Sequence, residues 1–129
     1  MTRPSAASLR LPRQQAPSPG TLRVVEVGGR VVGLFNVGGT FYALADRCPH
    51  RGAPLCSRGE VVGAIVPIGD RIVLVDEGAY VRCPWHKWDF EIATGKAPAA
   101  PWLQVRRYAV HVDGDDIVLS LDHATAGEG

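Results

Sequence analysis

The chain is divided into short apolar runs, rich in β-branched residues, that are separated by glycine, proline and aspartate. From residue 21 the runs TLRVVEV, VVGLFNV and FYALA are separated by GGR and GGT. Fifteen glycines and ten prolines oppose long helices, and no stretch of eleven or more residues has helical periodicity. Short runs bounded by turn residues are typical of strands joined by hairpins. The sequence therefore predicts an all-β fold.

A second set of strand-like runs follows: VVGAIVPI, RIVLV, AYVRC, WDFEI, QVRRYAVHV and DIVLSL. The segment at about 60–80 is predicted to add strands, in a hairpin that turns at Ile68-Gly69-Asp70. These strands extend the sheet, and a specific partner contact is the alternative.

The two ends of the chain differ in composition from the middle. Residues 1–20 contain four prolines and three arginines and no acidic residue, which predicts a flexible, solvated tail. The folded domain is expected over 21–121, and residues 122–129 are expected to form a flexible C-terminus.

Composition excludes several classes of function. The 129 residues suit one domain, and 46% hydrophobic with 21% charged residues is typical of soluble globular proteins. There is no run of 18 apolar residues to span a bilayer, no secretory h-region, and a net charge of only +1, which does not suggest nucleic-acid binding. Three cysteines without an export signal indicate the reducing cytoplasm, where metal binding or catalysis is favoured over disulfides.

Two predicted loops, residues 46–59 and 83–88, each contain a cysteine close to a histidine, and the first loop also contains Cys56. The patterns are Cys48-x-His50 and Cys83-x-x-His86. A zinc finger of the two-cysteine, two-histidine kind groups its cysteines before its histidines. The interleaved order instead favours two loops that clasp a binuclear centre, with both cysteines on one metal and both histidines on the other. A structural zinc on these side chains stays open as an alternative.

The segments CPHRGAPL, from Cys48, and CPWHKWDF, from Cys83, closely resemble the two cluster-binding boxes of the Rieske ferredoxin family. The likeness covers about residues 21–121. It implies a Rieske-type antiparallel β-sandwich, with a small cluster-binding subdomain formed by two loops, and one [2Fe-2S] cluster. By this resemblance Cys48, His50, Cys83 and His86 are the cofactor and metal ligands.

The second box departs from the high-potential members of this family. Trp85 stands where they have a disulfide cysteine, and Cys56 is eight residues beyond Cys48, so Cys56 is expected to be a buried bystander. Trp88 and Phe90 replace hydroxyl residues that raise the potential in those members. We therefore expect a potential in the lower part of the Rieske range of roughly −150 to +300 mV.

Residues around the boxes have further expected roles. Pro49 and Pro84 stiffen the loops, and Gly52 lets the backbone approach the cluster and direct N–H groups at sulfur. Trp102 is expected to pack in the loop that covers the cluster in this family. Five basic residues lie near the boxes: Arg47, Arg51, Arg58, Arg82 and Lys87. They form either a basic face around the cluster or a set of separate solvated charges.

The resemblance and the chain length together predict a soluble electron carrier. A ring-hydroxylating oxygenase needs a further catalytic domain with mononuclear iron, whereas only 43 residues follow His86. The expected function is transfer of one electron from a reductase to a terminal oxygenase or related oxidoreductase, with no catalytic site of its own. The small subunit of an assimilatory nitrite reductase, and a redox-sensing or structural metal module, are the alternatives.

Overall fold

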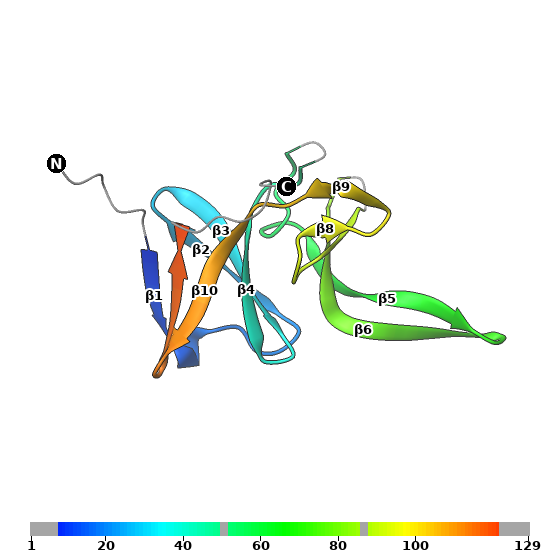
Figure 1. The fold of residues 1–129 in the computed structure, drawn as a ribbon, viewed down its shortest axis with the longest axis horizontal. Helices are drawn as coiled ribbons and strands as arrows, with labels where there is room; N and C mark the ends of the chain where they lie inside the picture. The colour runs from blue at the N-terminus through cyan, green and yellow to red at the C-terminus, as the bar shows by residue number, and fades with distance from the viewer. Residues whose placement is uncertain (1–7, 50–51, 86–87, 122–129) are drawn as a thin grey trace.

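The computed structural model describes residues 8–49, 52–85 and 88–121, and Figure 1 shows their arrangement. One antiparallel sheet has six strands in the order β1-β11-β10-β4-β3-β2. Its strands are β1 (Ser8–Pro12), β2 (Leu22–Val27), β3 (Arg30–Val37), β4 (Thr40–Ala45), β10 (Arg107–Asp113) and β11 (Asp116–Ser120).

Two smaller antiparallel sheets lie beside the six-stranded sheet (Figure 1). They consist of β5 (Glu60–Ile68), β6 (Arg71–Arg82) and β7 (Asp89–Glu91), and of β8 (Lys96–Ala97) and β9 (Ala100–Gln104). η1 (Arg13–Gln15) is a short 3-10 helix, and no described helix is long and apolar enough to cross a membrane. The prediction of an all-β fold is confirmed.

Glycine pairs close the turns of the β2–β3–β4 meander. The last pair before the turn is Val27 with Arg30 in the first hairpin and Val37 with Thr40 in the second, which leaves two residues in each turn. All four turn residues are glycines with φ between 55° and 98°, a left-handed region in which other residues are strained. The GG pairs in the sequence therefore set the register of these hairpins.

Alternation along β3 and β4 divides the core into two clusters. Val32 and Leu34 face one cluster, together with Ala43 of β4. Phe35 and Leu44 face the other cluster, which also contains the cysteines of both predicted ligand loops. One face of the sheet thus carries the hydrophobic support for the predicted metal centre.

The predicted insertion at about 60–80 forms a single long hairpin. β5 and β6 pair up to Ile68 with Arg71, so the turn lies at Gly69-Asp70, as expected. The runs RIVLV and AYVRC, expected as separate strands, belong to the one strand β6, with an irregularity opposite Val62 to Ala64. Figure 1 shows the tip of this hairpin pointing away from the six-stranded sheet.

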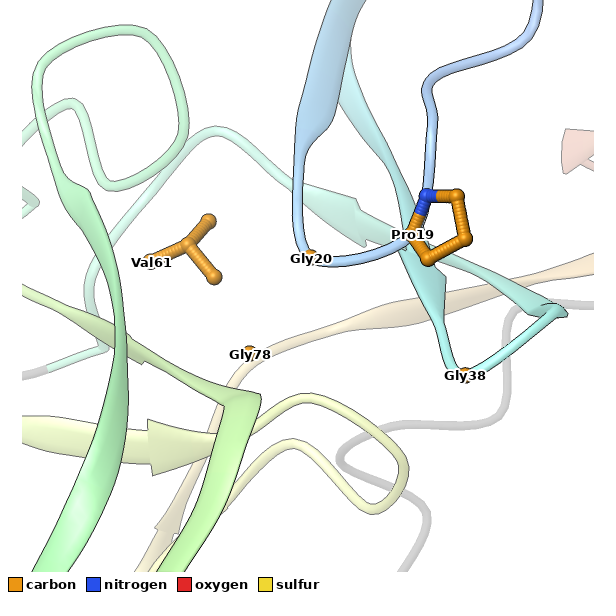
Figure 2. Close-up of a pocket in the computed structure, with 5 residues that line it drawn as sticks. All are labelled: Pro19, Gly20, Gly38, Val61 and Gly78. Carbon is orange, nitrogen blue, oxygen red and sulfur yellow. The ribbon is translucent and has the colours of Figure 1, made fainter. Parts of the chain in front are cut away.

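The base of this hairpin approaches the meander through small residues. Figure 2 shows the hollow between them, whose lining residues are Pro19, Gly20, Gly38, Val61 and Gly78. A Cβ on Gly78 would lie 3.0 Å from the Gly20 Cα, so the two backbones can come this close only without side chains. No charged side chain lines this hollow.

The N-terminal segment contradicts part of the expectation of a flexible tail over residues 1–20. Residues 8–12 form β1, which pairs with β11 from Ser8 with Ser120 to Pro12 with Asp116. Leu11 is 8% exposed and belongs to the core. The prediction failed because the apolar signal of β1 is only Leu9 and Leu11, among prolines and arginines. Residues 1–7 and 122–129 lie outside the described residues, so their assignment stays a prediction.

Leu11→Ala should lower the free energy of unfolding by about 2 to 3 kcal/mol, because it removes a buried side chain from the core. Thermal unfolding by circular dichroism measures this. Arg10→Gln is the control, since it breaks only the exposed ion pairs of Arg10 with Asp113 and Asp116 and should have a much smaller effect. An unchanged Tm for Leu11→Ala would show that β1 does not contribute to the folded domain.

Candidate metal centre

The first predicted ligand loop connects β4 to β5 and begins with a tight turn around Cys48. The Cys48 N–H donates to the Ala53 carbonyl oxygen at 2.8 Å, and the Gly52 N–H donates to the Cys48 carbonyl oxygen at 2.7 Å. Gly52 has a φ of 77°, and a Cβ there would lie 3.2 Å from the Arg47 Cζ. The Gly52 N–H is thus used within the loop, and its positive φ favours glycine at this turn, with the Arg47 guanidinium close by.

The carboxylate of Asp46 closes this loop. Its Oδ1 accepts hydrogen bonds from the backbone N–H groups of Cys56 (2.6 Å) and Ser57 (2.9 Å), and its Oδ2 accepts one from the Ser57 hydroxyl (2.6 Å). Charge-assisted hydrogen bonds of this kind are stronger than neutral ones. Asp46 therefore fixes the two ends of the loop that carries Cys48.

Cys56 is a buried packing residue. It is 3% exposed, and its thiol donates to the carbonyl oxygens of Leu44 (3.7 Å) and Ala45 (3.5 Å). A Cβ on Gly33 would lie 2.5 Å from its sulfur, so the thiol sits directly on the backbone of β3. Burial, and secondarily the charge of Asp46, raise the pKa of Cys56, which keeps it a neutral thiol. These contacts support the bystander role expected for Cys56.

The second predicted ligand loop is the turn of the β6–β7 hairpin. The Cys83 N–H donates to the Trp88 carbonyl oxygen at 2.7 Å, which closes the turn. In the adjacent register pair, Arg82 donates to both carboxylate oxygens of Asp89, at 2.8 and 3.2 Å. The hydrogen bond to Asp89 raises the pKa of Arg82. Arg82 is thus engaged in the hairpin and does not act as a free cation of a basic face.

The two loops meet at Gly59. A Cβ on this residue would clash with the carbonyl oxygen of Leu55 and would lie 2.7 Å from that of Arg82. The end of the first loop therefore passes directly against the start of the second. Cys48 and Cys83 are both 0% exposed and belong to the same buried cluster. The fold brings the two predicted cysteine ligands into one buried region.

The other predicted ligands, His50 and His86, lie outside the described residues, as do Arg51 and Lys87. Among the residues that the structure describes, no group of three or more His, Cys, Asp or Glu side chains is placed to hold a metal ion.

The structure does not support the expected packing of Trp102. This side chain is 80% exposed on β9, so it does not pack in a cluster-covering loop. Trp85 of the second box is 58% exposed. Both loops and β9 thus present an exposed face as well as a buried one.

The donor set on the described residues fits an iron–sulfur group. Cys48 and Cys83 are not in disulfides, come from two separate loops, and are enclosed by apolar side chains that exclude water. Thiolates are the ligands that iron–sulfur clusters take most often. Fold and site together fit the class of all-β iron–sulfur proteins, with two buried cysteines brought together from two adjacent loops.

The chain belongs to the Rieske [2Fe-2S] domain family, whose sequence model matches residues 10–111. The domain binds a [2Fe-2S] cluster, so the prediction of this cofactor is confirmed. The family match also begins at residue 10, eleven residues before the start expected from the sequence and within β1.

Relatives and solved structures agree with this assignment. The 3-phenylpropionate/cinnamic acid dioxygenase ferredoxin subunit of Escherichia coli K12 is 39% identical over 95 residues, which cover 73% of this chain and 76% of that protein. The ferredoxin of carbazole 1,9a-dioxygenase from Nocardioides aromaticivorans IC177 is 27% identical, with a TM-score of 0.63 over 89% of this chain and 98% of that one. A ferredoxin chain in a complex of reduced oxygenase and oxidized ferredoxin of carbazole 1,9a-dioxygenase is 26% identical, with a TM-score of 0.65 over 89% and 94%.

Cys56→Ala should leave the iron content and the visible spectrum unchanged, because Cys56 packs on β3 and is not expected to bind iron. Cys83→Ala is the comparison variant and should lose the cluster. Iron analysis and absorption spectroscopy on the purified variants measure both. Loss of iron from a folded Cys56→Ala protein would contradict the assignment of Cys56 as a bystander.

Gly59→Ala should lower the iron content and the Tm, because the added methyl meets two backbone oxygens and forces the loops apart, at a cost of about 1 to 3 kcal/mol. Gly114→Ala is the control: its added methyl meets nothing within 4 Å, although its φ of 62° also disfavours alanine. The control should lose some stability and keep its iron. Equal iron content in both variants would show that the close approach at Gly59 does not hold the loops together.

Proposed function

We propose that this chain is a soluble, cytoplasmic Rieske ferredoxin that carries one electron from a reductase to a terminal oxygenase or a related oxidoreductase. The observation that carries the proposal is the pair of buried cysteines on two adjoining loops of a Rieske domain. The 39% identical relative is a dioxygenase ferredoxin subunit, and a similar ferredoxin chain forms a complex with an oxygenase. The cluster, when bound, accepts and releases a single electron.

We propose that Cys48 and Cys83 bind one iron and that His50 and His86 bind the other. Burial of the cysteines and the spacing of both motifs support this assignment. The tight turn at Cys48 and the closed turn at Cys83 fix the backbone at both thiolates. Such fixed geometry limits the rearrangement that accompanies electron transfer.

The second box supports a potential in the lower part of the Rieske range. Trp88 is half-buried, and Phe90 is fully buried in the hydrophobic core that also contains Cys83. Neither side chain carries a hydroxyl that could donate to the cluster. Hydrogen bonds to the cluster are one determinant of its potential, so their absence at these two positions favours a lower value.

The alternative function as the small subunit of an assimilatory nitrite reductase has weaker support. A structure described as a nitrite reductase NADPH small subunit has a TM-score of 0.60 at 20% identity, which shows a similar fold alone. A structural metal module is the other alternative, and it predicts a site that does not undergo reversible reduction.

Protein-film voltammetry should give a reversible one-electron wave with a midpoint below about +100 mV, with no loss of iron over repeated cycles. His50→Cys and His86→Cys should each lower the midpoint if the cluster assembles, because each adds negative charge at iron. His111→Gln, at an exposed position of β10, is the control and should leave the midpoint unchanged. An irreversible wave with loss of iron would contradict the carrier function, and an unchanged midpoint in both cysteine variants would contradict the ligand assignment.

A further inference from the structure

Three arginines line a hollow beside the first predicted ligand loop. Arg30 begins β3, Arg47 follows β4, and Arg106 lies between β9 and β10. The hollow also includes Pro49, Gln104 and Tyr108. The hollow therefore gathers three positively charged side chains next to Pro49, the residue that follows Cys48.

The strand register explains why these arginines converge. Val32 of β3 pairs with Ala45 of β4, and the ladder continues one step further because the Asp46 N–H donates to the Val31 carbonyl oxygen at 3.1 Å. Side chains alternate between faces, so Arg30 and Arg47, two residues beyond the pair of Val32 and Ala45, lie on the same face as that pair.

The third arginine reaches the same face from the other side of β4. The Ala45 N–H donates to the Arg106 carbonyl oxygen at 2.9 Å, and Tyr108 pairs with Ala43. Arg106 and Tyr108 are therefore on the Ala43 and Ala45 face. The small side chain of Ala45 lies between the arginines and contributes to the lining of the hollow.

None of these three arginines forms an ion pair with a described residue, and all three are exposed. Arg10 and Arg82, in contrast, are paired with aspartates. Guanidinium groups that share one hollow repel one another, and an anion bound between them relieves this repulsion.

The nearby acidic side chains do not provide this anion. Asp46 already accepts three hydrogen bonds from Cys56 and Ser57. Glu26 pairs with Val31, which places it on the opposite face from Arg30. The arginines therefore remain available for an external carboxylate.

We propose that this arginine hollow is a docking site for acidic side chains on the surface of the redox partner. The proposal rests on the proposed function and names the surface chemistry of the partner. The three exposed guanidinium groups come from different parts of the chain, and a group of positive charges of this kind attracts and orients an acidic protein surface. Arginine also binds carboxylates through two parallel hydrogen bonds. Pro49 lies between Cys48 and the proposed ligand His50, so a partner docked in this hollow contacts the first ligand loop.

The test is stopped-flow oxidation of the dithionite-reduced holoprotein by plastocyanin, an acidic copper protein, with the basic protein cytochrome c as the second acceptor. In each reaction one electron leaves the reduced cluster, and Cu(II) becomes Cu(I) or haem Fe(III) becomes Fe(II). The Arg30→Gln/Arg106→Gln protein is compared with Arg13→Gln/Arg23→Gln, which changes the net charge equally at exposed sites outside the hollow. Voltammetry first checks that the midpoint is the same in all proteins.

The hollow variant should reduce plastocyanin at least about fivefold more slowly at low ionic strength, while the control changes by less than about twofold. Reduction of cytochrome c should not slow. Poly-L-glutamate should inhibit the plastocyanin reaction of the unchanged protein more strongly than inorganic phosphate at equal charge.

Equal plastocyanin rates in the hollow variant and the control would overturn the docking site and leave the carrier function standing. Equal inhibition by phosphate and polyglutamate would overturn it in favour of a small-anion site. Failure of the unchanged reduced protein to reduce either acceptor would contradict the proposed function itself.

Discussion

The arrangement of the metal centre depends on a close backbone approach at Gly59, where the first loop passes against the carbonyl oxygens of Leu55 and Arg82. Only a residue without a Cβ allows this approach. Together with the neighbouring β-pair of Glu60 and Arg82, it places the end of one cysteine loop against the start of the other, and Cys48 and Cys83 are buried in a common cluster. A second close contact, Gly33 against Cys56, fixes the first loop to the six-stranded sheet. Two glycines thus join the ligand loops to each other and to the fold.

Charged side chains near the loops have two different roles. Asp46 and the Arg82–Asp89 pair are satisfied within the protein and hold the ends of the two loops. Arg30, Arg47 and Arg106 have no such partners among the described residues and line a common hollow. The first group maintains the geometry around the cysteines, and the second group is available to a partner. The sequence suggested the same role for Arg47 and Arg82, whereas their contacts in the structure give them different roles.

The sequence was sufficient to predict what depends on local pattern. Glycine pairs and β-branched runs predicted the all-β fold, the β2–β4 meander and the turn at Gly69-Asp70, and the two cysteine–histidine motifs predicted the cofactor. Contacts between distant segments were not predictable in the same way. Nothing local in Gly59 reveals that it meets Arg82, and β1 has too weak an apolar pattern to reveal its pairing with β11. The sequence carries part of the information for the arginine hollow, since Gln104, Arg106 and Tyr108 alternate and can therefore share one face of a strand. Placing them beside Arg30 and Arg47 requires the register of β4, which the sequence does not give.

The central claim is that two cysteines and two histidines on this chain hold a redox-active [2Fe-2S] cluster. Electron paramagnetic resonance of the dithionite-reduced protein, with iron and zinc analysis of the same sample, tests it most directly. The expected result is an axial or rhombic signal with the average g value of mixed histidine and cysteine ligation, together with two irons per chain. A sample without a signal that contains zinc in place of iron would contradict the claim.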